Sequence, residues 1–156
     1  MNKTIIIKKI KQEKKITTPK YLLEMEPQTA LNKLYLGIDF EGATEAKKNI
    51  QKKISSYAAQ DKKKKRYTIE KMVTIGEVIE KLVVSKMKCY YCNHHLLLFY
   101  SYIREPFQWT LDRIDNTEGH NTDNLRISCL KCNLERRTRD DKKFLFSKQM
   151  KIIKKN

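Results

Sequence analysis

The sequence lacks any apolar run long enough to cross a membrane. Its longest apolar stretch, Leu96–Tyr100, is far shorter than the roughly 20 residues of a transmembrane helix. The run Ile5–Ile7 is also too short for the hydrophobic part of a secretory signal, so we expect an intracellular protein with no membrane partner. Cysteine is absent except in two Cys-x-x-Cys pairs, and the expected intracellular location argues against disulfides between them.

Acidic residues are too few to balance the basic ones, and the excess positive charge is unevenly placed. The chain has 34 Lys and Arg against 18 Asp and Glu, which gives a net charge of +16 in 156 residues. Residues 44–88 carry +8 and residues 142–156 carry +6, whereas residues 89–141 carry −1. Basic flanks of this kind favour a polyanionic partner, because lysines that contact phosphates release bound counterions. Lysines that only keep the chain soluble are the alternative.

Four segments can be distinguished along the chain, which contains no internal repeat. Residues 1–43 form an N-terminal extension of unassigned structure, with a short strand and a basic arm expected before Pro19. Residues 44–88 form a basic helical region, residues 89–140 contain all four cysteines, and residues 141–156 form a basic C-terminal tail.

Two helices are expected within the basic helical region. The first carries an apolar stripe at helical spacing, with Thr44 as its N-cap; the stripe consists of Ala46, Ile50, Ile54 and Tyr57. The basic run from Asp61 interrupts this stripe and is interpreted as an exposed loop or a frayed helix end. Its candidates for contact with nucleic acid are Lys62, Lys63, Lys64, Lys65 and Arg66. The second helix begins with a capping box at Thr74 and Glu77 and should extend to about Lys86.

The spacing of the cysteines predicts a metal site. Cys89 and Cys92 form one pair, Cys129 and Cys132 form the other, and 36 residues separate the two pairs. Four thiolates complete a tetrahedral Zn²⁺ shell and leave no position for water, so we expect a structural zinc ion rather than a catalytic one. Such an ion would replace part of the core that so short a segment cannot build. A redox Cys-x-x-Cys motif is the alternative.

Between the two cysteine pairs the pattern predicts a strand, a loop, a second strand and a helix. The expected strands are Trp109–Leu111 and Leu125–Ser128, and the helix should open near Lys131. This order places Asp112 at the end of one strand and Asn133 in the first turn of the helix. A carboxylate and an amide oxygen are hard ligands that suit Mg²⁺ or Mn²⁺.

The string from Asp112 to Asn133, DRIDN…GH…DN…CxxCN, resembles the HNH (ββα-metal, His-Me finger) endonuclease family. It is most similar to the zinc-bearing branch with four cysteines, as found in phage and giant-virus nucleases, and the resemblance covers residues 89–139. It implies an α+β protein with a zinc-stapled, treble-clef-like ββα-metal module in residues 89–140. In that module Asp112 and Asn133 would bind the catalytic Mg²⁺ or Mn²⁺, and Asn124 would bond the loop backbone. The implied reaction is hydrolysis of duplex or branched DNA, leaving a 3′-hydroxyl and a 5′-phosphate.

One position departs from the family pattern. The family usually has its general-base histidine directly after the first aspartate, where this chain has Arg113. Arginine keeps its proton and cannot activate water, although it can bind a phosphate or stabilise developing negative charge. His120 is the one histidine of the loop, and histidine titrates near the pH at which a general base works, so we expect it to be the base. A metal-bound hydroxide, another group, or loss of activity are the alternatives.

Two arginines follow Asn133 on the predicted helix. Arg136 and Arg137 lie three and four residues beyond it, on the same side, so both are expected to reach phosphates. The sequence as a whole therefore predicts a metal-dependent DNA endonuclease, acting in the host cytoplasm or nucleus if it is viral. Its rival is a non-catalytic, zinc-stapled DNA-binding or architectural protein derived from such a nuclease. The oligomeric state and the DNA target are left open.

Overall fold

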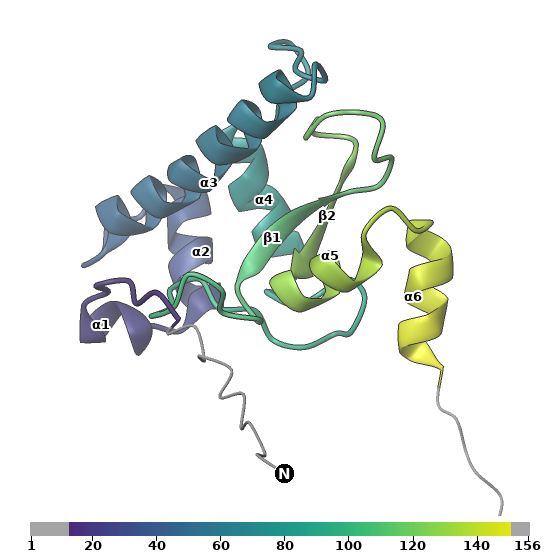
Figure 1. Ribbon diagram of the computed structural model, residues 1–156. Helices are drawn as coiled ribbons and strands as arrows, with labels where there is room; N and C mark the ends of the chain where they lie inside the picture. The colour runs from purple at the N-terminus through teal and green to yellow at the C-terminus, as the bar shows by residue number, and fades with distance from the viewer. Residues whose placement is uncertain (1–12, 151–156) are drawn as a thin grey trace, which may run out of the picture.

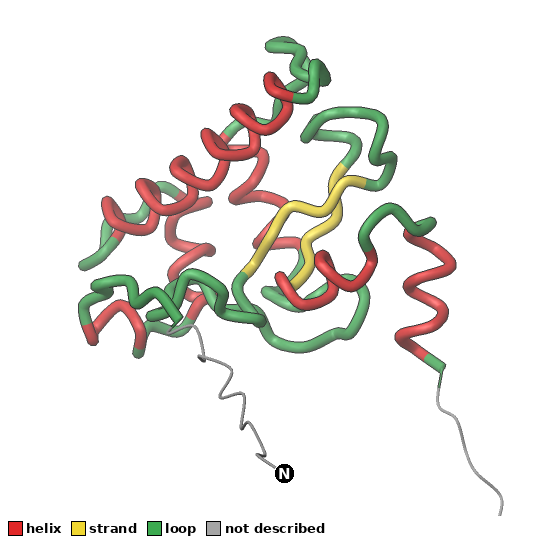
Figure 2. The backbone as a smooth tube through the Cα atoms, viewed as in Figure 1, coloured by secondary structure: helices red, strands yellow, loops and turns green. Residues whose placement is uncertain are grey.

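The computed structural model describes residues 13–150, in which six helices surround a two-stranded antiparallel sheet (Figures 1 and 2). The elements in chain order are α1 (Lys20–Leu23), α2 (Pro27–Leu36), α3 (Ala43–Lys63), α4 (Ile75–Val84), β1 (Trp109–Arg113), β2 (Leu125–Cys129), α5 (Leu130–Arg136) and α6 (Asp141–Gln149). The fold is therefore mixed α+β, as expected. Within residues 13–150, no helix combines the length and apolar character that a membrane span requires. A strand was expected before Pro19; residues 1–12 of that segment lie outside the described residues, and in the described part Lys15 forms an isolated antiparallel bridge with Tyr102.

α3 follows the apolar stripe expected from the sequence. Ala46, Ile50 and Ile54 are buried along it. The helix begins one residue before Thr44, which is therefore not the N-cap. That place is taken by Gly42, whose φ of 97° is left-handed and where an added Cβ would lie only 2.5 Å from Cδ2 of Leu22. At its other end α3 continues through Asp61 to Lys63, so of the two expectations for the start of the basic run, a loop or a helix end, the structure has the helix end.

α4 confirms the predicted capping box. The Thr74 side chain accepts from the Glu77 N–H, and the Glu77 carboxylate accepts from the Thr74 N–H. The helix ends at Val84 rather than near Lys86, because Lys86 and Met87 adopt left-handed φ values of 53° and 50°. This turn redirects the chain toward the first cysteine pair.

β1 and β2 contain the two strands predicted between the cysteine pairs, and they pair as an antiparallel hairpin with Trp109 opposite Cys129 and Arg113 opposite Leu125. β2 passes directly into α5, because Cys129 ends the strand and serves as the N-cap of the helix. Figure 1 shows α5 lying across one face of the hairpin and α4 behind the other. The order of elements is thus strand, loop, strand, helix.

One hydrophobic core joins the helices to the hairpin. It extends from Leu22 in α1 through Ile50 in α3 and Trp109 in β1 to Phe144 in α6. The first part of the C-terminal tail is therefore a docked helix, in which the Phe144 ring meets the Tyr91 ring edge to face at 4.9 Å. This core contains residues from both sides of the expected boundaries at 88/89 and 140/141, so these boundaries do not separate two cores.

Candidate metal centre and active site

The four cysteines gather at one end of the hairpin. Their Sγ atoms all lie within 4.8 Å of one another, with Cys92 and Cys129 separated by 3.9 Å. Sulfurs around a tetrahedral zinc ion lie about 3.8 Å apart, because each Zn–S bond is about 2.3 Å long. The thiols are free rather than joined in disulfides. The cluster can therefore hold a metal such as zinc.

The electrostatics of the cluster also fit a cation. Hydrogen bonds from the thiols of Cys129 and Cys132 lower the pKa of Cys89 below its usual range. Hydrogen bonds with Cys129 and Cys89 in turn raise the pKa of Cys132. One thiolate thus opposes the ionisation of its neighbours, and a divalent ion supplies the positive charge that four adjacent thiolates need.

Five of the residues with predicted metal-binding, catalytic or DNA-binding roles line one pocket of about 280 Å³ between the end of α3, the hairpin and α5, whereas Asn124 is not among its lining residues. Of those predictions, the pocket brings together Asp112, Arg113, His120, Asn133 and Arg137. Its remaining walls come from α3, the strands, the loop and α5: Tyr57, Gln60, Leu111, Asn116 and Leu134. Positions 112 and 133 are 21 residues apart in sequence, and the hairpin brings them to the same pocket.

Asp112 is buried, with 3% of its surface exposed, and one of its oxygens is already engaged. Oδ2 accepts hydrogen bonds from the Tyr91 hydroxyl and from Nη1 of Arg136, the latter at 2.8 Å. Burial raises the pKa of the carboxyl, and these two donors act against that rise. Oδ1 is the oxygen that can serve a further ligand.

The amide of Asn133 is oriented by the hairpin. Its Nδ2 donates to Oγ1 of Thr110 at 3.2 Å, and that hydroxyl donates to the carbonyl of Ser128 at 2.9 Å. Because the hydroxyl proton is used on Ser128, Thr110 can only accept from the amide nitrogen. The opposite end of the amide, Oδ1, is therefore the free end, as a metal ligand requires.

Asn124 has the contacts expected from its predicted role. Its Oδ1 accepts from the Asp115 N–H at 2.8 Å, and its Nδ2 donates to the carbonyls of Asp115 and Gly119, both at 3.0 Å. Arg113 also bonds the loop, since its Nη1 donates to the carbonyls of Asn116 and Glu118 at 2.9 and 3.1 Å. The two side chains together fix the path of the loop from residue 115 to residue 119.

His120 follows this stretch of the loop and is buried, with 5% of its surface exposed. Its Nδ1 lies 2.8 Å from Oδ1 of Asp61, and its backbone N–H donates to Oδ2 of the same carboxylate at 2.7 Å. The imidazole stacks on the Tyr57 ring with the centroids 4.4 Å apart. Desolvation is the largest influence on the ring and lowers its pKa, although the hydrogen bond with Asp61 opposes the change.

Asp61 is the residue that sequence reasoning missed. It was grouped with the basic run as exposed, yet only 2% of its surface is accessible. The signal was its spacing: Asp61 lies four residues after Tyr57 and continues the apolar stripe of α3. A carboxylate on the buried face of a helix needs a partner, and the loop supplies it.

Arg136 does not lie where phosphate binding requires. It is 1% exposed, and its guanidinium bonds Asp112, the carbonyls of Arg113 and Ile114, and the carbonyl of Arg139. Arg136 is buried and connects α5 to β1 through these hydrogen bonds. At three positions after Asn133 on the helix, its side chain faces the hairpin and not the solvent. We therefore remove it from the predicted nucleic-acid-binding residues.

Arg137 and the lysines of the basic run are exposed, as their predicted role requires. Arg137 ends α5 with a φ of 55° and lines the pocket. Arg66 is half-buried, and its N–H donates to the Asp61 carbonyl at 2.8 Å. The exposed lysines are Lys62, Lys63, Lys64 and Lys65, and they lie at the end of α3 that carries Asp61.

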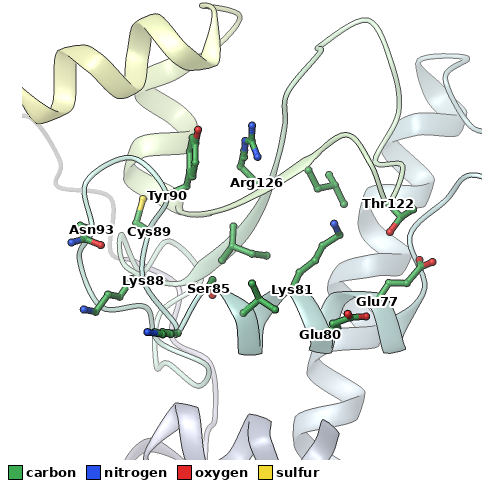
Figure 3. Close-up of a pocket in the computed structure, with 14 residues that line it drawn as sticks. Glu77, Glu80, Lys81, Ser85, Lys88, Cys89, Tyr90, Asn93, Thr122 and Arg126 are labelled. Atoms are coloured by element: carbon green, nitrogen blue, oxygen red, sulfur yellow. The ribbon is translucent and has the colours of Figure 1, made fainter.

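A more spacious cavity of about 680 Å³ lies between α4, the Cys89–Asn93 turn and β2 (Figure 3). Its charged walls have mixed sign, with Glu77 and Glu80 near Lys81 and with Arg126 toward the strand. None of the pocket residues with predicted catalytic roles lines it. Its lining therefore gives it no recognisable catalytic chemistry.

Comparisons with known proteins identify no relative: no family model, curated protein or solved structure matches this chain.

Proposed function

We propose that this protein is a metal-dependent DNA endonuclease with an HNH (ββα-metal) site and a structural zinc ion in its cysteine cluster. The observation that carries the proposal is the pocket in which Asp112, Asn133 and His120 meet beside a strand–loop–strand–helix unit. These three side chains offer a carboxylate oxygen, an amide oxygen and an imidazole. That is the set of groups needed to hold a divalent cation and to accept a proton from water.

Asp112 and Asn133 are the residues that would hold Mg²⁺ or Mn²⁺. Each has one side-chain oxygen available, and hard oxygen donors fit such a cation. Arg136 shares the Asp112 carboxylate and offsets its charge, so we expect weak cation binding until DNA phosphates supply further oxygens. When bound, the cation would stabilise negative charge on the phosphate and on the leaving oxygen.

His120 is the proposed general base. Because burial lowers its pKa, the imidazole is neutral near pH 7 and can accept a proton. Arg137 is exposed at the rim of the same pocket and would bind a phosphate. The lysines from Lys62 to Lys65 would neutralise phosphates farther along the DNA.

A plasmid-nicking assay tests this proposal. Supercoiled DNA is incubated with the zinc-loaded full chain in Mg²⁺ or Mn²⁺, and in EDTA as the metal-free control. We expect conversion to nicked circles that requires the added cation, is abolished in Asn133→Ala, and persists in Asn32→Ala, a matched change at an exposed position of α2. Failure of the wild type to nick duplex or branched DNA in either metal would contradict the proposal.

The second candidate function is a non-catalytic DNA-binding or architectural protein. Arg113 favours it, because this residue stands where the HNH family usually has its base and its guanidinium bonds loop carbonyls. Arg113→His separates the two functions. If the wild type is inactive and the histidine variant nicks DNA, the chain is a decayed nuclease and the architectural function is correct.

A further inference from the structure

We propose that Asp61 is a positioning residue that fixes the tautomer of His120, so that Nδ1 carries the proton and Nε2 is the basic nitrogen. This inference rests on the proposed nuclease function. It assigns to α3, which lies outside the segment that resembles HNH nucleases, a direct part in building the active site.

The geometry leaves one tautomer. An ionised carboxylate can only accept hydrogen bonds, so an Nδ1 atom 2.8 Å from Oδ1 of Asp61 must be the donor. The other carboxylate oxygen accepts from the His120 backbone N–H at 2.7 Å, which ties the ring and the loop to the same group. The lone pair of the imidazole is then on Nε2.

The surroundings hold this pair in place. Tyr57, one turn before Asp61, stacks on the imidazole at 4.4 Å and limits its rotation. Gly119 permits the close approach, because an added Cβ there would lie 2.6 Å from the carbonyl oxygen of Arg66 and 3.0 Å from Oδ2 of Asp61. Asp61 and His120 are both about 95% buried or more, so water does not compete for their hydrogen bonds.

The proton follows a simple path in the proposed reaction. A water molecule gives one proton to Nε2 of His120 while its oxygen forms a bond to phosphorus. The bond between phosphorus and the 3′ oxygen breaks, and that oxygen keeps the electron pair and takes a proton from solvent. The imidazolium now has protons on both nitrogens, and Asp61 stabilises its charge before Nε2 returns a proton to water.

Asp61→Asn tests the role because it keeps the shape of the side chain and changes its hydrogen-bonding chemistry. In Asp61→Asn the side-chain amide oxygen accepts from the backbone N–H of His120, so the amide NH₂ points toward Nδ1. Because NH₂ is a donor, Nδ1 must then accept, which favours the tautomer protonated on Nε2. We expect kcat for plasmid nicking to fall about 10²–10⁴-fold. DNA affinity and zinc content should be unchanged, and Asp39→Asn, a change at an exposed loop carboxylate, should retain wild-type activity.

The pH profile provides a readout that a purely structural role would not move. The charged groups facing His120 are Asp61 and Arg66 from α3 and the turn after it, and Arg113 from β1. Asp61 acts to raise the pKa of His120, so its loss should shift the acid limb of kcat to lower pH. A lower rate with an unshifted acid limb would overturn the positioning role.

Nitrogen NMR of the wild-type full chain tests the tautomer without relying on activity or on a variant that folds. We expect ¹⁵N shifts of His120 that report a protonated Nδ1 and an unprotonated Nε2 near pH 7.5. The opposite tautomer in the wild type would overturn the inference even if the protein nicks DNA. An inactive wild type with the expected tautomer would instead count against the nuclease function alone.

Discussion

Two adjacent arginines, Arg136 as the last residue of α5 and Arg137 as its C-cap, should respond to the same substitution in opposite ways. Arg136 is 1% exposed and Arg137 is exposed, although both were expected at the DNA surface from the sequence. Changing each residue to methionine removes the guanidinium and keeps an unbranched apolar side chain. The pair therefore serves as its own matched control.

The expected cost at Arg136 can be derived from its contacts. The substitution leaves the Asp112 carboxylate without its cationic partner, and it removes donors from the carbonyls of Arg113, Ile114 and Arg139. Removing one partner from a buried ion pair costs about 3–5 kcal/mol. A protein of this size has roughly 5–15 kcal/mol of stability in total, so Arg136→Met should be severely destabilised.

Denaturant unfolding of the zinc-loaded proteins, followed by circular dichroism, measures this difference. Arg137→Met should stay within about 0.5 kcal/mol of the wild type, as surface substitutions usually do. It should instead weaken DNA binding and make the log–log salt dependence shallower by about 1, because one phosphate contact is lost. An Arg136→Met protein destabilised by less than about 1 kcal/mol would refute the reasoning, and so would a larger loss at Arg137.

Other parts of the molecule give four further tests: the cysteine cluster, the C-terminal lysines, Lys53 and His120. Cys129→Ser should abolish stoichiometric zinc binding by elemental analysis and unfold the hairpin, because structural zinc supplies much of the folding free energy at small sites. Truncation after residue 150 removes three lysines and spares α6. It should make the log–log slope of DNA affinity against salt concentration shallower by up to about 2.7. An unchanged slope would show that these lysines do not contact DNA. Burial lowers the pKa of Lys53 to about 7, so between pH 7 and pH 9 Lys53 keeps its proton in the unfolded chain and loses it in the folded one. The unfolding free energy should therefore rise with pH over this range. In Lys53→Met this rise should disappear, and a persistent rise would assign it to other groups. His120→Ala should slow nicking about 10²–10⁴-fold with little change in DNA affinity, and a wild-type rate would show that another group is the base.

Local signals in the sequence predicted α3, α4, the two strands and α5, whereas α1, α2 and α6 were not predicted. The capping box at Thr74, the stripe of α3 and the order strand, loop, strand, helix all depend on residues close in sequence, and the structure contains each of them. The boundaries were less accurate where tertiary contacts decide them. Gly42 replaces Thr44 as the N-cap of α3 because α1 packs against that turn, which no local pattern reveals.

The sequence predicted many of the individual residues of the candidate site but not the contacts between residues far apart in the chain. The cysteine spacing predicted the cluster, and the resemblance to HNH nucleases implied the backbone contacts of Asn124. Asp61 and His120 are 59 positions apart, so no local pattern predicts their hydrogen bond. Because lysines follow Asp61, its carboxylate was interpreted as part of an exposed run although it is buried. Arg136 was expected at the surface for the same reason, because a charged side chain suggests exposure unless its buried hydrogen-bond acceptors are known.

The arginine at position 113 and the histidine at position 120 form one arrangement when their contacts are considered together. Arg113 donates to the carbonyls of Asn116 and Glu118, so this side chain shapes the loop, and a guanidinium cannot activate water. The shaped loop brings His120 to the same pocket, and the carboxylate that bonds its ring comes from outside the hairpin. α3 supplies that carboxylate, and the shared core holds α3 against the hairpin. The segment that resembles HNH nucleases is therefore not self-sufficient in this chain, because the orientation of its proposed base depends on a helix that precedes it.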